Sequence, residues 1–315
     1  MKIMVTPRSF SSTSDKPKNL LEEKYSNIDY NDTGKPYSKE VMKEKIKNVD
    51  GIIIGIDPLD DEVLKEAKDL KIISKYGVGT DNIDLDYASK NNIVVTNTPN
   101  ANNNAVADLA FGLMITLARR IVEADYRTKS DEWGKIIGSA VNNKVLGVIG
   151  LGKIGKEVVK RAQGFNMEVM VYDIEEDEEF KEKYGVEYVS KEDLLKKADF
   201  ISIHTPLTPQ TKDLITKREL EMMKETSFLV NTSRGGIVNE EDLYYALKEN
   251  LIKGAALDAF VNEPPEDSPL KELDNIIMTS HMGAYTVEAI EKMGVDAVKN
   301  LIAVLEGEEP ENNLI

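Results

Sequence analysis

The sequence predicts an α/β protein made of two doubly wound parallel-sheet domains. The chain has 315 residues, which is more than one ordinary hydrophobic core accommodates, so two domains are expected. Short apolar runs alternate with polar stretches of helical character in the first third, a pattern typical of a parallel sheet covered by helices. A second series of the same kind begins at Val145 and carries its own glycine-rich turn.

The first series is expected to contain short strands and helices in alternation. Strands are predicted at 2–5, 51–55, 71–74 and 93–96, and helices at 38–47 and 60–68. An Asn-rich loop at 100–104 then precedes a long helix over 105–121. Asp108 lies in the first turn of that helix and Arg119 near its end, where these charges favour the helix dipole.

The second series supplies more strands. They are predicted at 145–149, 169–172, 200–203, 228–231, 255–257 and 276–278, with helices at 156–163 and 287–305. An acidic run at 175–182 is interpreted as the start of a solvated helix. Residues 1–102 and 286–315 are expected to form one domain, and residues 103–285 the other.

Composition narrows the class of protein. A hydrophobic share of 41% and a charged share of 30% are typical of a packed interior with a solvated surface. No apolar run reaches the roughly 20 residues that cross a bilayer, and the start does not resemble a signal peptide, so a cytoplasmic protein without membrane contact is expected. The absence of cysteine excludes disulfides, thiol catalysis and thiolate metal sites, and no metal site is predicted. A net charge of −16 argues against nucleic-acid binding.

A glycine motif indicates a dinucleotide site. The predicted strand over 145–149 runs into a G-x-G-x-x-G turn at 150–155 that opens a helix. Gly150 allows the tight turn, Gly152 lets the backbone approach a pyrophosphate, and Gly155 permits close packing of helix and strand. The site is therefore assigned the following residues of the turn: Gly150, Gly152, Lys153, Ile154 and Gly155. The alternative is that the glycines only shape a turn.

An acidic residue completes this motif. Asp173 ends the next predicted strand, where its carboxylate can accept hydrogen bonds from the ribose hydroxyls of adenosine. A carboxylate would repel a 2′-phosphate, and no arginine follows at 174 or 175. The sequence therefore favours NAD over NADP as the cofactor.

Several segments after the glycine turn resemble one family, the D-2-hydroxyacid dehydrogenases. The segments are NTSRGG at 231–236, DAFVNEP at 258–264 and SHMGA at 280–284, with support from YGVGTDNID at 76–84, NTPN at 97–100 and HTPL at 204–207. They occur in order over essentially the whole chain. The resemblance implies a Rossmann NAD-binding domain inserted into a flavodoxin-like substrate domain, and a small 2-hydroxy or 2-keto acid as substrate.

The chemistry of 2-hydroxyacid oxidation explains three of the residues. A base is needed to take the hydroxyl proton while a hydride leaves carbon 2, and His281 is the candidate. Glu263 would orient the imidazole and favour its charged form. Arg234 would hold the substrate carboxylate and polarise the carbonyl through its planar donors. The resemblance gives these three the same roles; taken singly, they could be a core histidine, a turn residue and a surface ion-pairing residue.

Other site residues are implied by the resemblance alone. The backbone N–H groups of Val78 and Gly79 would bind the substrate carboxylate, with Asn100 nearby. The NAD site would be lined by Thr205, Pro206, Thr232, Asp258 and Gly283, with Asp258 accepting from the nicotinamide carboxamide. His204 is interpreted as structural or as lying on the cofactor side. A homodimer is expected, in contact through the long helix from residue 105 and the segment that reaches Trp133.

Whether the substrate is phosphorylated depends on the positively charged side chains near the site. Lys75, Arg8 and Lys135 are candidates for a phosphate pocket, although phosphoglycerate dehydrogenases often have arginine at the position of Lys75, and all three could be ordinary surface charges. A phosphoglycerate dehydrogenase is the first hypothesis, without serine feedback because no regulatory domain follows. A reductase of glyoxylate, hydroxypyruvate or a branched 2-keto acid is the second. An NAD-sensing binding protein similar to certain corepressors is the third.

Overall fold

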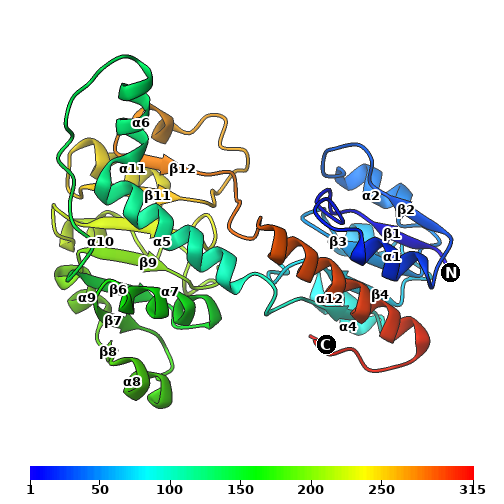
Figure 1. Ribbon diagram of the computed structural model, residues 1–315. Coiled ribbons are helices and arrows are strands. Elements are labelled where there is room, and N and C mark those ends of the chain that lie inside the picture. Colours follow the sequence, from blue (N-terminus) through cyan, green and yellow to red (C-terminus); the bar gives the residue numbers. More distant parts are fainter. The chain divides into compact units, whose positions relative to one another are not determined.

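A computed structural model describes residues 1–315, and the chain divides into two compact units (Figure 1). The first unit comprises Met1–Asn102 and Ala284–Ile315, and the second comprises Asn103–Gly283. The chain therefore crosses between the units twice, and both of its ends belong to the first. None of the helices combines the length and apolarity that a membrane crossing requires.

The first unit is built on a five-stranded parallel sheet with the order β2-β1-β3-β4-β5. The strands are β1 (Ile3–Val5), β2 (Ile28–Tyr30), β3 (Gly51–Ile54), β4 (Ile72–Lys75) and β5 (Val94–Thr96). Neighbouring strands pair in parallel, for example Ile3 with Gly51 across β1 and β3. This order is the flavodoxin-like arrangement, so the predicted fold class of this unit is confirmed.

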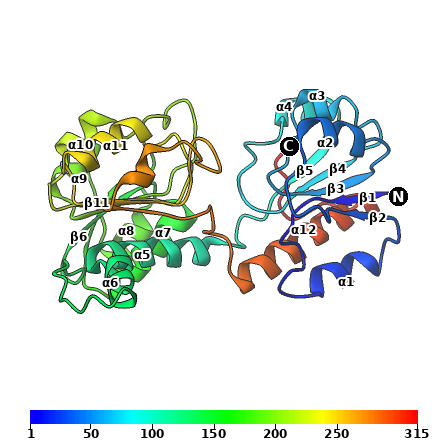
Figure 2. The same cartoon turned by 90° about the horizontal axis from the view of Figure 1, so that it is seen from above.

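Helices cover both faces of this sheet (Figure 2). They are α1 (Lys16–Glu22), α2 (Lys39–Lys45), α3 (Asp61–Leu64), α4 (Leu85–Lys90) and α12 (Val287–Glu306). Because successive side chains of a strand point to opposite faces, Ile3 and Val5 pack with α1 and α12, whereas Met4 packs with α2, α3 and α4. The last helix thus completes the core of the first unit.

The second unit contains a seven-stranded parallel sheet with the order β12-β11-β10-β9-β6-β7-β8. The strands are β6 (Val145–Ile149), β7 (Glu168–Tyr172), β8 (Glu187–Tyr188), β9 (Phe200–Ile203), β10 (Phe228–Asn231), β11 (Gly254–Leu257) and β12 (Ile276–Met278). The order reverses between β6 and β9, as in a Rossmann fold extended by one strand, which confirms the prediction for this unit.

Two layers of helices flank the second sheet. The helices are α5 (Asn103–Arg119), α6 (Ile121–Lys129), α7 (Lys153–Gln163), α8 (Glu178–Tyr184), α9 (Lys191–Lys197), α10 (Lys217–Met222) and α11 (Glu240–Lys248), with a 3-10 turn, η1 (Pro269–Glu272). Residues of α5, α7 and α8 share one core with the sheet, and residues of α9, α10 and α11 share the other. Figure 2 shows these layers on opposite sides of the strands.

Several predicted helices begin or end at other residues, and the helix expected over 60–68 ends already at Leu64. The helix expected over 105–121 ends at Arg119, because Arg120 adopts a left-handed conformation (φ 51°) and α6 starts after it. The helix expected from 156 begins at Lys153, since Gly152 is its N-cap and the glycine motif supplies its first turn.

Several short helices were missed although their N-caps were visible in the sequence. The side chains of Asp84, Ser190 and Asn239 each accept a hydrogen bond from the backbone N–H three residues later, and each of them starts a helix. A search for such caps in front of charged stretches would have located α4, α9 and α11.

Candidate active site

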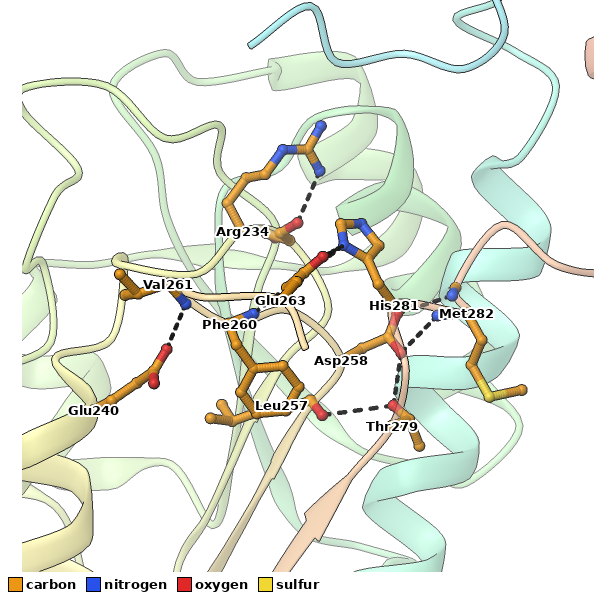
Figure 3. A network of polar contacts seen from close by, with 12 residues as sticks. Arg234, Glu240, Leu257, Asp258, Phe260, Val261, Glu263, Thr279, His281 and Met282 are labelled. Carbon is orange, nitrogen blue, oxygen red and sulfur yellow. Dashed lines mark hydrogen bonds and ion pairs between the residues drawn. The ribbon is translucent and has the colours of Figure 1, made fainter. Parts of the chain in front are cut away.

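Three loops at one edge of the second sheet carry the predicted catalytic residues. Arg234 follows β10, Glu263 follows β11 and His281 follows β12. Because these strands are parallel neighbours, their carboxyl ends meet at the same edge. Figure 3 shows the three side chains on adjacent loops, with Glu263 facing the imidazole of His281.

His281 and Glu263 form a direct pair. The Nδ1 atom of His281 lies 2.9 Å from each carboxylate oxygen of Glu263. Burial acts to raise the pKa of Glu263, but the hydrogen bonds from His281 and from the Phe260 N–H, with the nearby charge of Arg234, hold that pKa below its usual value. The carboxylate therefore fixes the ring through Nδ1, and Nε2 is left as the nitrogen that can exchange a proton with a substrate.

The turn that carries His281 is held by Asp258. His281 has a positive φ of 52°, which is uncommon for a residue with a side chain. Asp258 is 1% exposed, and its Oδ1 accepts from the Thr279 hydroxyl (2.6 Å) and from the Met282 N–H (2.8 Å). Its Oδ2 accepts from the Gly283 N–H (2.8 Å). The structure thus gives Asp258 a role in fixing the His281 backbone, which sequence reasoning missed.

Arg234 sits on a turn packed against the Glu263 loop. Its Nη1 donates to the carbonyl of Ser233 at 2.8 Å. A Cβ atom added to Gly235 would lie only 2.0 Å from the carbonyl carbon of Phe260, so the two backbones are in direct contact there. This contact brings Arg234 beside Glu263, in agreement with the effect of its charge on the Glu263 pKa.

The glycine turn has the geometry that a dinucleotide requires. Gly150 has φ +92°, and a Cβ there would lie 2.8 Å from the His204 backbone. A Cβ on Gly155 would lie 2.2 Å from the Gly150 oxygen, whereas one on Gly152 would meet nothing within 4 Å. The first and third glycines are thus needed for packing, and the second leaves open space before the N-terminus of α7, where Lys153 and Ile154 begin the helix.

Asp173 lies at the carboxyl end of β7, as predicted. Its Oδ2 accepts from the Leu151 N–H of the glycine turn at 2.5 Å, and its Oδ1 accepts from the Ile174 N–H at 2.6 Å. The carboxylate therefore joins the turn to the next strand and lies where a ribose would be bound in this fold.

Buried polar side-chain atoms that have no hydrogen-bond partner lie in the loops after β9 and β10. The hydroxyls of Thr205 and Thr232 and the Nδ1 of His204 have no hydrogen-bond partner. Pro206 follows Thr205 in the same loop. Unpaired buried groups of this kind are costly, and they favour a site that a polar ligand completes. Together with the open space at Gly152, they fit a dinucleotide.

His204 differs from His281 in its environment. Its Nε2 lies 2.8 Å from the Ser202 hydroxyl, and burial lowers its pKa to about 3. The residue as a whole is only half-buried, but its Nδ1 is buried and has no hydrogen-bond partner, so the direction of this pKa shift follows from its surroundings. His204 is therefore neutral at physiological pH, in line with a structural role.

The residues of the first unit that were predicted to bind the substrate differ in burial and in hydrogen bonding. Val78 and Gly79 follow β4, and the Val78 carbonyl accepts from the Asn97 amide at 2.9 Å. Asn100 is exposed. Lys75 is buried, and its Nζ donates to the Gly55 carbonyl at 2.6 Å and to Asn82 Oδ1 at 2.7 Å. These bonds tie the loops after β3 and β4 together.

The other two candidate cations are on the surface. Arg8 is exposed, and its Nη1 lies 3.4 Å from the Gly34 carbonyl. Lys135 is exposed and belongs to the second unit. A phosphate pocket made by Lys75, Arg8 and Lys135 stays a prediction.

Comparisons with known proteins agree with this geometry. Residues 111–283 match the family model described as "D-isomer specific 2-hydroxyacid dehydrogenase, NAD binding domain". A glyoxylate reductase of Thermococcus litoralis is 43% identical over 300 residues, covering 92% of this chain and 91% of that protein. A D-3-phosphoglycerate dehydrogenase of Methanocaldococcus jannaschii is 43% identical over 279 residues, covering 87% of this chain but 53% of that protein. The solved structure of D-lactate dehydrogenase from Aquifex aeolicus with NAD and lactic acid has a TM-score of 0.87 and 30% identity, with 99% of each chain covered.

Proposed function

The chain belongs to the D-isomer specific 2-hydroxyacid dehydrogenases, an NAD-dependent family, and we propose that within it the preferred substrate is a small unphosphorylated 2-keto acid such as glyoxylate or hydroxypyruvate. The reaction would be its reduction to the 2-hydroxy acid. The paired His281 and Glu263 beside Arg234 carry the catalytic part of the proposal. The proposal of an unphosphorylated substrate rests on Lys75. This residue is buried, and its ammonium donates to Gly55 and Asn82.

The proton chemistry follows from the pair. His281 would hold a proton at Nε2 and give it to the substrate carbonyl oxygen, while Glu263 stabilises the charged ring through Nδ1. Arg234 would bind the substrate carboxylate with its planar donors and polarise the carbonyl. NADH, when bound, supplies the hydride that the carbonyl carbon accepts. The reverse reaction would use His281 as a base.

The second unit would hold the cofactor. Residues of the glycine turn and the N-terminus of α7 would bind the pyrophosphate, and Asp173 would bind the adenosine ribose. Further contacts are proposed for Thr205, Pro206, Thr232, Asp258 and Gly283. Backbone N–H groups of Val78 and Gly79 are proposed for the substrate carboxylate.

A phosphoglycerate dehydrogenase is the second candidate. The 43% identity with the Methanocaldococcus enzyme favours it, as does the retained cation at Lys75. Against it, each ammonium hydrogen bond that Lys75 makes to Gly55 or Asn82 would have to break before that donor could serve a phosphate.

One assay separates these candidates. NADH oxidation by the purified protein is measured with glyoxylate, hydroxypyruvate, pyruvate, 2-ketoisocaproate and 3-phosphohydroxypyruvate. We expect the highest kcat/KM with glyoxylate or hydroxypyruvate, and we expect His281→Ala to abolish turnover while NADH still binds. A preference for 3-phosphohydroxypyruvate would replace the proposal by the second candidate. Binding of NADH without turnover of any acid would favour an NAD-sensing protein.

A further inference from the structure

Two consecutive backbone N–H groups, of which the second belongs to the peptide between Phe260 and Val261, donate to two different carboxylates. The Phe260 N–H donates to Glu263 Oε1 at 3.0 Å, and the next N–H, that of Val261, donates to Glu240 Oε1 at 2.7 Å. Figure 3 shows Glu240 reaching this peptide from the side opposite His281. The loop is therefore held at Phe260 by its own Glu263, and at Val261 by Glu240 from another part of the chain.

Glu240 comes from a firmly held element. It is the first residue of α11, whose N-cap Asn239 accepts from the Asp242 N–H at 3.1 Å. Leu243, Ala246 and Leu247 of the same helix are buried in the core of the unit. A hydrogen bond from a backbone N–H to a carboxylate is among the stronger ones, so α11 provides a fixed point for the exposed end of the loop.

The loop needs such a fixed point. Residues 261–264 are exposed, and the packing of Gly235 against Phe260 supports only one side of the peptide. We infer that Glu240 is a positioning residue for Glu263, and through Glu263 for the imidazole of His281; the inference rests on the proposed catalytic role of that pair. A displacement of a catalytic group by about 1 Å can lower a rate by as much as 100-fold.

Two acids of α11 provide a matched comparison. Glu240 and Glu241 both lie in the first turn and affect the helix dipole alike, but Glu241 is exposed and it is Glu240 that accepts from the Val261 N–H. E240A removes the acceptor for Val261. E240Q removes the charge but keeps an oxygen that can accept, and E241A is the control for helix stability.

The measurement uses the small number of histidines. The chain has only His204 and His281, so NMR of the imidazole Hε1 protons yields two signals, and His281→Ala assigns them. The charged groups that face the His281 turn are Glu263, Arg234 and Asp258. We expect E240A to change the chemical shift of the His281 signal at a fixed pH, because the ring is held less firmly against Glu263. E240Q should shift it less, and E241A should leave it in place.

Turnover gives a second readout. E240A should lower kcat about tenfold with NADH affinity unchanged, and it should have little further effect when E263Q is already present. Equal His281 chemical shifts in E240A and E241A would overturn the inference, and equal changes in E240A and E240Q would assign the effect to charge instead of position. The NMR measurement needs no substrate, so it decides the role of Glu240 even if the proposed reaction fails.

Discussion

At the scale of single residues, the site depends on backbones that touch. Gly235 is required because the carbonyl carbon of Phe260 occupies the space of a Cβ atom, and because no flexible side chain is there to move away. The turn of Arg234 and the loop of Glu263 can therefore keep their mutual position only if residue 235 is glycine.

Gly235→Ala should thus separate the two loops. We expect a loss of about 2 kcal/mol in the free energy of unfolding and a fall in kcat/KM of roughly 100-fold, since overpacking costs 1–3 kcal/mol and catalysis is sensitive to displacement. Urea denaturation and steady-state kinetics would measure these. Gly164→Ala is the matched control, because a Cβ there makes only an ordinary contact at 3.5 Å. Wild-type kinetics for the Gly235 variant would contradict the packing argument.

His204 makes folding sensitive to acid. Its pKa falls from 6.5 to about 3 on folding, so between these values the unfolded chain binds a proton that the folded chain does not. Stability from this group is fully present above pH 6.5 and decreases as the pH falls toward 3. The free energy of unfolding is compared between pH 7.5 and pH 5. We expect this difference to be about 2 kcal/mol smaller in His204→Gln than in the wild type. An unchanged difference in urea denaturation would show that the histidine is not neutral in the folded state.

At the scale of elements, the unit β6–turn–α7–β7 was predictable nearly in full. Strand β6 was expected at its observed bounds, and Gly150 and Asp173 lie where the motif required, because local sequence dictates a tight turn and a buried strand. The contact of Asp258 with the His281 turn could not be predicted, since it joins residues from two strands and depends on their register. The burial of Lys75 also could not be predicted from the sequence, because lysine is seldom buried.

Asp173 holds the glycine turn of this unit through the Leu151 N–H, and it is proposed to bind the ribose as well. Asp173→Ala removes the charge that would repel a 2′-phosphate, and it also removes the acceptor of the Leu151 N–H. We expect the ratio of kcat/KM for NADPH to that for NADH to rise at least tenfold, with weaker binding of NADH. Asp193→Ala, in the first turn of α9, is the control. An unchanged ratio would refute the ribose assignment.

At the scale of the whole molecule, an apolar surface is left uncovered. Ile121, Val122, Tyr126, Trp133 and Ile137 are exposed along α6 and the segment after it, with Trp133 at 93% and Ile137 at 89%. Several large apolar side chains exposed along one segment support the homodimer that we propose. We expect Trp133→Glu to shift the mass measured by light scattering from dimer to monomer. Val41→Glu, on α2 of the other unit, should not, and a monomeric wild type would disprove the proposal.

The position of α12 in the chain has a consequence for synthesis on the ribosome. Ile290, Met293, Ala297 and Leu301 of this helix fill one face of the first sheet, yet they are translated after the entire second unit. The second unit can therefore complete its core while the nascent chain is still growing. The first five strands, although made earlier, cannot bury that face until α12 has left the ribosome, so the first unit completes its core after the second.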